Sequence, residues 1–249
     1  MAGHSKWANI KHKKGRQDAK RAKIFTKMGR EIMVSVKQGG ADPAANARLK
    51  LALQKARAAN MPGDNIKRLI QRAAGEGGVN NYEELTYEGY GIGGTAVIVD
   101  VLTDNRNRTA GEIRHAFDKF GGNLGETGCV SWMFETRGEI LLDALEEESD
   151  DLTLMAIEAG AEDVEYDDGT LTVYTEPALL EEVRERLEAL GRNVQSAEIA
   201  RVPTNTVMIE DREQAEKLIR MMDMLEDNDD VQNTWSNFDF SPEIAGELS

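Results

Sequence analysis

Cysteine is almost absent from the chain, with Cys129 alone among 249 residues. A single cysteine excludes an intrachain disulfide and any zinc site built from cysteines. Long apolar runs are also missing, since no stretch approaches the roughly 20 apolar residues of a membrane helix. The basic residues near the N-terminus are not followed by the apolar core of a secretory signal. These absences predict a cytoplasmic protein with no membrane partner, and the apolar run CVSWMF predicts a buried Cys129.

Signatures of catalysis are equally scarce. The chain has no serine nucleophile elbow, no H-E-x-x-H helix and no P-loop. Histidine occurs only as His4, His12 and His115. The first two lie among cations, where they would add donors to phosphate, and His115 is expected to be structural beside an apolar stripe. We therefore expect a protein that is not an enzyme and that holds no metal or cofactor.

Two local patterns imitate ligand sites but lack a necessary part. Gly89, Gly91 and Gly94 fit the spacing G-x-G-x-x-G, yet the strand-like TAVIVDV follows where a dinucleotide fingerprint requires a helix. A glycine-rich turn between strands is therefore expected. The acidic runs EEESDD (146–151) and EDNDD (226–230) lack the glycine and the terminal glutamate of a calcium loop. We expect them to be solvated ends of helices.

Charge is abundant and unevenly distributed. The first thirty residues hold ten Lys or Arg and one acid. Residues 1–75 carry 18 basic and 4 acidic side chains, a net +14, and the remainder carries 12 and 41, a net −29, which together give the −15 of the whole chain. Such asymmetry indicates that the N-terminal part seeks a polyanion and that the rest repels one. Nucleic acid is the leading candidate partner.

The basic N-terminal segment is the predicted nucleic-acid site, because its cations are too dense for the two acids near them in sequence, Asp18 and Glu31. Each phosphate that they neutralise would add to a salt-dependent affinity. The alternatives are docking on the protein's own acidic part and a role in solubility alone. Trp7 could equally stack on a base or anchor the segment to the helices. The candidate residues are Lys6, Trp7, Lys11, His12, Lys13, Lys14, Arg16, Lys20, Arg21, Lys23, Lys27 and Arg30.

Apolar spacing predicts three short helices in the first 75 residues. From Ile24 onward an apolar residue recurs at every fourth position until Gly39-Gly40 ends the pattern. Asp42 as N-cap and Pro43 as first residue predict the start of a second helix. A third helix follows the turn MPGDN. Three amphipathic helices joined by tight turns predict a small bundle, with a linker at 75–81.

Strand patterns and acidic side chains follow the linker. The order βαββαβ in the middle of this part is that of a ferredoxin-like unit, and Asp168-Gly169 is a hairpin signal within it. The predicted elements are strands at 85–90 and 95–102, a helix at 109–120, strands at 129–134 and 139–143, a helix at 150–159, strands at 163–167 and 170–175, a helix at 177–190, strands at 194–201 and 207–210, a helix at 212–225 and a strand at 231–238.

The fold class expected is α+β, with an N-terminal three-helix domain followed by two α/β domains, one ferredoxin-like (βαββαβ) and inserted in the other. The last strand, helix and strand cannot close a domain alone, so we pair them with the first α/β segment. The expected domains are 1–75, 82–136 plus 204–240, and the insertion 137–203.

The predicted insertion is strongly acidic. Residues 138–200 contain 3 basic and 19 acidic side chains, so an RNA strand would meet a net −16 there. Its third strand, LTVYT, also lacks the basic-aromatic signature of RNA-recognition motifs. A basic protein surface, such as that of a ribosomal protein, is the partner expected for this domain.

Several long segments resemble the YebC/PmpR family over essentially the whole chain. They are AGHSKWANIKHKKGRQDAKRAKIFTK, YEGYGIGG, DNRNRTAGEIRHAFDKFGGNLGETGCVSWMF, IEAGAEDV and MLEDNDDVQNTWSNFDF. The resemblance implies a helical N-terminal domain plus two α/β domains, one inserted in the other, with the segment from Lys6 to Lys23 contacting nucleic acid. Two positions depart from the family pattern: Ile92 stands where proline is common, and Gly29 replaces an apolar residue at a cost of about 1 kcal/mol in helix propensity.

The function implied by this resemblance is regulation of gene expression. Bacterial members are generally described as DNA-binding transcriptional regulators. A mitochondrial relative is assigned to activating translation of a cytochrome oxidase subunit, and bacterial relatives are linked to the ribosome. We therefore expect a non-enzymatic nucleic-acid-binding regulator, with DNA as the first expected target. The alternatives are a ribosome-associated translation factor that binds ribosomal RNA, and an acidic protein-interaction adaptor. No helix shows the base-reading pattern that would decide between DNA and RNA.

Overall fold

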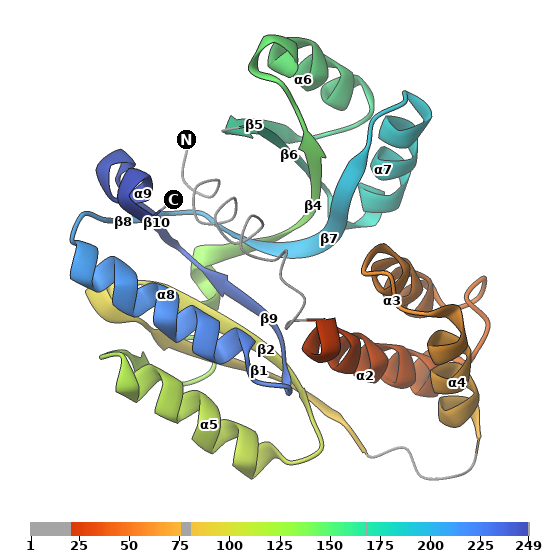
Figure 1. The fold of residues 1–249 in the computed structure, drawn as a ribbon, viewed down its shortest axis with the longest axis horizontal. Coiled ribbons are helices and arrows are strands. Elements are labelled where there is room, and N and C mark those ends of the chain that lie inside the picture. The colour runs from red at the N-terminus through yellow and green to blue at the C-terminus, as the bar shows by residue number, and fades with distance from the viewer. Residues whose placement is uncertain (1–20, 76–80, 168, 249) are drawn as a thin grey trace.

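The structure is a computed structural model that describes residues 21–75, 81–167 and 169–248 (Figure 1). A group of three helices lies beside two four-stranded sheets, and a pair of helices packs on each sheet. This architecture confirms the α+β class and the helical start of the fold that the sequence predicts. We keep the domain boundaries given above as a proposal.

Three helices form the N-terminal unit: α2 (Arg21–Gly39), α3 (Ala47–Ala58) and α4 (Gly63–Ala74). Their apolar faces share one core, in which Ile32, Leu49 and Ala56 are fully buried. Gly29 lies inside α2, and a Cβ added there would lie 3.4 Å from Cδ1 of Leu69 in α4. The glycine does not interrupt the helix, and a Cβ at this position would make ordinary van der Waals contact with α4.

The predicted start of the second helix is wrong by four residues. Asn46 is the N-cap of α3, because its Oδ1 accepts the N–H of Leu49 at 3.0 Å. Its Nδ2 also donates to the carbonyls of Ser35 and Gly40, each at 2.8 Å. Asp42 instead closes a local turn by accepting the N–H of Ala44 at 3.0 Å. The buried Asn46 serves the end of α2 and the start of α3 together, which a local capping rule does not detect.

The first sheet has the antiparallel order β3–β1–β2–β9, with β1 Glu83–Tyr90, β2 Ala96–Thr103, β3 Asn123–Leu124 and β9 Val231–Ser236. Two helices, α5 (Arg106–Lys119) and α8 (Arg212–Glu226), cover one face. There Val97 and Val99 of β2 pack with Phe117 and Leu218. Strand β9 pairs with β2, although the whole second sheet lies between these two strands in sequence. Beside this sheet are the parallel pair β8 Val207–Ile209 and β10 Phe238–Phe240, and α9 Pro242–Leu248.

The second sheet has the fully antiparallel order β5–β6–β4–β7. This is the strand order of a ferredoxin-like unit, as the sequence predicts. Its apolar core lies between the sheet and two helices and includes Ile140, Leu152, Leu171 and Val183. The elements are β4 Phe134–Asp143, α6 Ser149–Glu158, β5 Asp163–Asp167, β6 Thr170–Thr175, α7 Leu180–Ala189 and β7 Val194–Pro203.

The strand predicted at 129–134 is wrong, since this segment is a 3₁₀ turn (η3, Ser131–Met133) and β4 begins after it. The reason is the buried carboxylate of Glu88 on β1. Its Oε1 accepts the N–H of Gly128 at 2.8 Å, and its Oε2 accepts those of Val130 and Ser131 at 2.9 and 2.8 Å. The backbone donors that a strand would use are therefore satisfied by a side chain.

Smaller differences concern element ends. Helix α5 begins three residues earlier than predicted, because Oδ1 of Asn105 caps it by accepting the N–H of Arg108 at 3.1 Å. Cys129 is half-buried rather than buried.

The glycine-rich turn between β1 and β2 is confirmed, and Gly93 and Gly94 have φ of +73° and +75° in it. Three further 3₁₀ turns are η2 Ile92–Gly94, η4 Glu146–Glu148 and η5 Pro177–Leu179.

Candidate nucleic-acid interface

The predicted site divides between residues inside and outside the described part of the chain. Arg21 is the first residue of α2. Lys23, Lys27 and Arg30 follow at spacings of four and three, which places them on one face of that helix. Lys6, Trp7, Lys11, His12, Lys13, Lys14, Arg16 and Lys20 lie outside the described residues.

This face of α2 contacts an acidic segment that consists of Glu226, the last residue of α8, and the turn from there to β9. We call this segment the 226–230 loop. Nζ of Lys23 lies 3.1 Å from Oδ1 of Asp227 and donates to its carbonyl at 3.2 Å. Nζ of Lys27 donates to the carbonyl of Glu226 at 2.6 Å. The cations have partners about 200 residues away in sequence, which an inspection of neighbouring acids does not find.

Arg30 makes the deepest of these contacts. Its Nη1 donates to the carbonyl of Asp229 at 2.5 Å and to Oδ1 of Asp230 at 2.7 Å. Its guanidinium also lies over the ring of Tyr82, 5.7 Å from the centroid. Only 16% of its side chain is exposed. In this structure the middle of α2 is therefore fastened to the body of the protein by a buried charge-assisted hydrogen bond.

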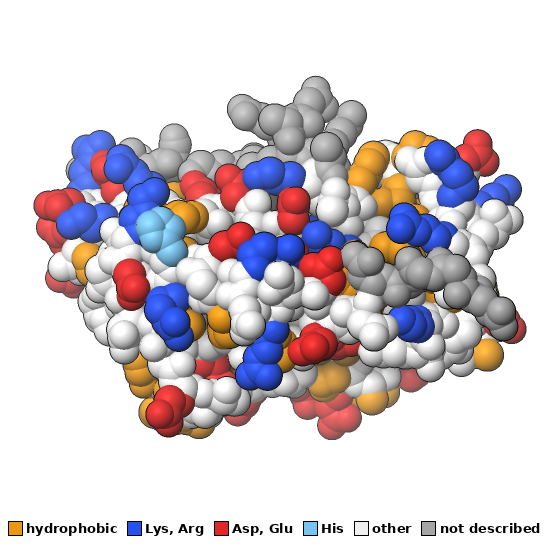
Figure 2. Space-filling model, turned by 90° about the horizontal axis from the view of Figure 1, so that it is seen from below, with side chains coloured by type: hydrophobic (Ala, Val, Ile, Leu, Met, Phe, Trp, Pro, Cys, Tyr) orange, Lys and Arg blue, Asp and Glu red, His pale blue; other side chains and the backbone are white. Residues whose placement is uncertain are grey.

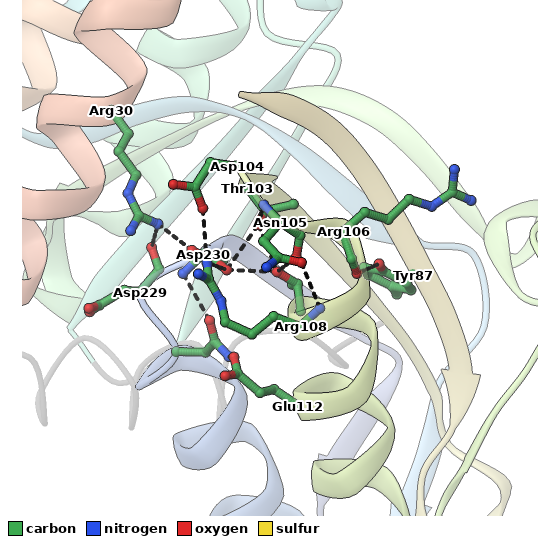
Figure 3. Close-up of polar contacts among 12 residues, drawn as sticks. Arg30, Tyr87, Thr103, Asp104, Asn105, Arg106, Arg108, Glu112, Asp229 and Asp230 are labelled. Carbon is green, nitrogen blue, oxygen red and sulfur yellow. Dashed lines mark hydrogen bonds and ion pairs between the residues drawn. The ribbon is translucent and has the colours of Figure 1, made fainter. Parts of the chain in front are cut away.

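Asp230 is the centre of this contact (Figure 3). Its Oδ2 accepts hydrogen bonds from the hydroxyls of Thr103 and Thr109, at 3.0 and 2.6 Å, and from Nη2 of Arg108 at 2.6 Å. With Arg30 on Oδ1, the carboxylate joins α2, β2 and α5. The expectation that the run 226–230 is a solvated helix end is wrong at this position, because Asp230 is 2% exposed.

The bonds around Asp230 set its ionisation. Burial alone raises the pKa of Asp230, but the donors Arg108, Thr109, Thr103 and Arg30 outweigh burial and hold that pKa below its usual range. The same bonds raise the pKa of Arg108. The carboxylate is therefore ionised at neutral pH, and its four donors satisfy the charge that burial would otherwise leave uncompensated.

The helical unit also contacts the ferredoxin-like unit through charged side chains. Nζ of Lys55 lies 2.8 Å from Oε2 of Glu198 on β7. Gln54 donates to Oε2 of Glu181 at 3.2 Å. Within the helical unit, both oxygens of Glu31 pair with Arg48, at 2.8 and 3.1 Å, so this acid is occupied by α3 rather than by the basic segment.

A different set of cations on α3 and α4 has no ion pair within the described part of the chain. Arg57, Lys67, Arg68 and Arg72 are all exposed. Arg68 and Arg72 are four residues apart on α4, where two like charges destabilise a helix slightly. Asp64 lies one turn before Arg68 but forms no ion pair with it, and Arg68 donates to the Asp64 carbonyl at 3.3 Å. Four exposed cations around one acid favour an anionic partner. The three cations of α4 are not among the site residues predicted from the sequence, although the sequence contains the charge spacing R-x-x-x-R there.

A shallow apolar cavity opens beside two of these cations. Its volume is about 350 Å³, and Arg57 and Lys67 lie at its edge. The apolar wall comes from side chains on both sides of the turn between α3 and α4: Pro43, Leu53, Met61, Ile66 and Ile70. The cavity therefore places an apolar surface beside two exposed cations.

The surface of the body differs from that of the helical unit. On the face seen from below, basic and acidic side chains are intermingled and form no extended patch of one sign (Figure 2). On α8, Lys217 pairs with Glu213, and Arg212 and Arg220 pair with Glu216. His115 is exposed on α5, so its expected structural role is not supported.

Two other kinds of site have no counterpart among the described residues. In 21–75, 81–167 and 169–248, no three His, Cys, Asp or Glu side chains come together as a group that could hold a metal ion. Within the same ranges, no helix has the length and apolar character needed to cross a membrane.

Together, these features define an α+β protein in which a cation-rich helical unit is ion-paired to two α/β units. The chain belongs to the TACO1/YebC family. Residues 5–76 match the family's N-terminal domain, and residues 82–238 match its second and third domain. The family expected from the sequence is thus confirmed.

Relatives resemble the chain over nearly its full length. A protein of Desulfitobacterium hafniense (strain DSM 10664 / DCB-2) is 54% identical over 249 residues, covering 99% of each chain. One from Halothermothrix orenii is 53% identical, covering 100% of this chain and 99% of the other. Both are named probable transcriptional regulatory protein. The crystal structure of a conserved hypothetical protein from Aquifex aeolicus superposes with a TM-score of 0.87 at 48% identity, covering 96% of this chain and 99% of that one.

Proposed function

We propose that the protein is a non-enzymatic regulator of gene expression that binds nucleic acid through its basic N-terminal region. The observation that carries this proposal is the net +14 of residues 1–75 beside the net −29 of the rest. A polyanion approaching the molecule is attracted to one end and repelled by the other, so charge alone orients the encounter. The names of the relatives support a role in transcription for this family.

The proposed contact surface has two parts. The first is the basic segment from Lys6 to Lys20 together with Arg21 and the α2 cations Lys23, Lys27 and Arg30. The second, which the exposed cations of α3 and α4 support, consists of Arg57, Lys67, Arg68 and Arg72. Phosphates bound by both parts would place the nucleic acid along the helical unit and away from the acidic ferredoxin-like unit.

DNA is the target proposed first, and ribosomal RNA is the alternative. Lysine and arginine contacts to phosphate serve both equally, so the cations alone do not choose between DNA and RNA. The deciding experiment is crosslinking in cells followed by sequencing of the bound nucleic acid. Recovery of promoter DNA supports transcriptional regulation. Recovery of ribosomal RNA with little DNA would overturn it in favour of a translation factor.

A second candidate function is docking of a basic protein on the ferredoxin-like unit. Leu154 and Ile157 lie one turn apart on α6, with 62% and 52% of each residue exposed. Two large apolar side chains at the centre of an exposed helix face suit a partner with its own apolar residues. The acids around them require that partner to be basic: Glu147, Asp150, Asp151 and Glu158. A ribosomal protein meets this description.

A further inference from the structure

The cations of α2 proposed to bind nucleic acid already hold anionic and carbonyl oxygens of the protein itself. Lys23, Lys27 and Arg30 meet five oxygens of the 226–230 loop at distances of 2.5 to 3.2 Å. Four of the five residues in the loop are acids. For a lysine or arginine, closely spaced carboxylate and carbonyl oxygens resemble the oxygens of successive phosphates.

The buried donor of Arg30 cannot serve the loop and a nucleic acid together. Nη1 of Arg30 is already shared between the carbonyl of Asp229 and the carboxylate of Asp230. With 16% of the Arg30 side chain and 3% of the Asp230 side chain exposed, no phosphate can reach this pair while the contact holds. A nucleic acid that uses Arg30 must therefore displace the loop.

We propose that the 226–230 loop is an internal competitor for nucleic acid, and that nucleic acid bound across α2 releases this helix from the body of the protein. The inference rests on the proposed function, and it adds regulation of the same site. While α2 is docked on the 226–230 loop, nucleic acid is bound by the basic residues that do not contact the loop. After release, α2 adds three cations to the interface, so binding and release are coupled.

The network is built so that release leaves no buried charge unpaired. When Arg30 departs, Asp230 keeps the hydroxyls of Thr103 and Thr109 and the guanidinium of Arg108. The carboxylate then loses one of four donors, which costs far less than leaving a bare buried charge. Arg30, Lys27 and Lys23 in turn exchange oxygens of the loop for oxygens of phosphate.

The contacts between the helical unit and the ferredoxin-like unit allow the same movement. The pair Lys55–Glu198 has side chains 37% and 31% exposed, and Lys50 is 3.9 Å from Glu185 with both exposed by half or more. Exposed pairs of this kind contribute little and are screened by salt. Arg48 of α3 also pairs with Glu84 of β1 at 2.6 Å, with side chains 34% and 49% exposed. The contact at Arg30 is the most buried of these links, and it is the one that a polyanion can replace.

The experiment compares the full-length protein with loop variants in binding to a DNA duplex of about 20 base pairs, a length that presents enough phosphates to span a helix. Asp227→Asn with Asp230→Asn removes two loop charges without changing shape. Glu213→Gln with Glu216→Gln on α8 removes two charges away from α2 and serves as the matched control. We expect the loop variant to bind at least about five-fold more tightly than the control, the lower end of usual coupling factors.

A measurement on the unaltered protein keeps the test independent of how the variants fold. Hydrogen exchange of the segment 226–231 is followed by mass spectrometry with and without the duplex. Faster exchange on binding supports release. If the unaltered protein binds the duplex but exchange is unchanged and the loop variant matches its control, the competitor role is wrong and the proposed function stands. If it binds neither this duplex nor a ribosomal RNA stem-loop of equal length, the proposed function fails first.

Discussion

Arg30 and Asp230 form a hydrogen-bonded ion pair of 2.7 Å across 200 residues of sequence. The pair fastens the only strongly basic unit of the protein to the acidic remainder. Because its carboxylate is shared with β2 and α5, the contact both organises the body and positions α2. The stability of the fold and the availability of α2 to a ligand are therefore connected at one side chain.

Removing the Asp230 carboxylate should destabilise the protein. Asp230→Ala leaves four donors without their shared acceptor, and we expect the free energy of unfolding to fall by about 2–4 kcal/mol. The matched control is Asp229→Ala, whose side chain is exposed and whose role in the contact is through its backbone carbonyl. That variant should stay within about 0.5 kcal/mol of the unaltered protein. Urea denaturation compares the two, and equal losses would contradict the central place of Asp230.

Acid should weaken the same network. The folded pKa of Asp230 lies below its ordinary value of 3.8, so its contribution to stability is present above about pH 4 and is lost as the pH falls through the lower folded pKa. Melting temperatures measured from pH 6 down to about pH 3 should decline less steeply for Asp230→Asn than for the unaltered protein. Parallel curves would show that this carboxylate does not carry the acid sensitivity.

Glu88 should control the loop that presents Trp132. Burial raises the pKa of Glu88, but the three backbone N–H groups outweigh burial and lower the pKa overall. Glu88→Gln replaces an accepting oxygen by an N–H donor facing other donors, at a cost of about 2–3 kcal/mol. Trp132, which is 70% exposed and donates to the carbonyl of Cys129 at 3.1 Å, should change its fluorescence in the variant at neutral pH. An unchanged spectrum and stability would contradict this role.

The cations of α4 should contribute to nucleic-acid binding without contributing to stability. Arg68→Glu with Arg72→Glu should weaken binding to DNA or RNA about ten-fold and reduce the salt dependence by roughly two phosphate contacts. Arg68 and Arg72 are exposed, so reversing them should change the free energy of unfolding by no more than about 1 kcal/mol, and the melting temperature should change little. Arg212→Glu with Arg220→Glu on α8 is the control with the same change of net charge. Equal weakening in both variants would assign the effect to net charge alone.

The exposed apolar pair on α6 should matter for a protein partner and not for nucleic acid. Leu154→Ser with Ile157→Ser should lower the affinity for purified ribosomes by about ten-fold, if the pair is the centre of an interface. Leu190→Ser removes an apolar side chain that is 54% exposed elsewhere on the same unit and serves as control. Binding to isolated DNA or RNA should be unchanged in both variants. If ribosomes sediment equally well with all three proteins, this surface is not the docking site.

Much of the fold follows from local pattern, because most elements bury one face along a regular period. The strands of the ferredoxin-like unit and the apolar faces of α3 and α8 are of this kind. The errors arise where a side chain from a distant segment supplies the hydrogen bonds. Glu88 turns an apparent strand into a 3₁₀ turn, and Asn46 takes the cap that Asp42 was expected to provide.

The candidate site shows the same division. Charge composition identifies the basic end of the chain, because electrostatic attraction to a polyanion depends on the sum of charges rather than on their exact partners. Composition does not reveal that Arg30 is buried against Asp230, since their pairing depends on the packing of α2 beside β9. Sequence reasoning therefore locates the basic end of the chain and misses the contact that occupies part of it.

The most direct test of the account is the salt dependence of nucleic-acid binding by the full-length protein. Affinity for a DNA duplex and for a ribosomal RNA stem-loop is measured over a range of salt, with Lys11, Lys13, Lys14 and Arg16 intact or changed to Glu. As control, the same number of charges is reversed at Lys119, Arg212, Lys217 and Arg220. We predict that the logarithm of the binding constant falls with the logarithm of the salt concentration, with a slope of about −0.9 per duplex phosphate contacted. This salt dependence should be lost in the N-terminal variant and kept in the control. An affinity that is flat with salt, or unchanged by the N-terminal reversal, would contradict it.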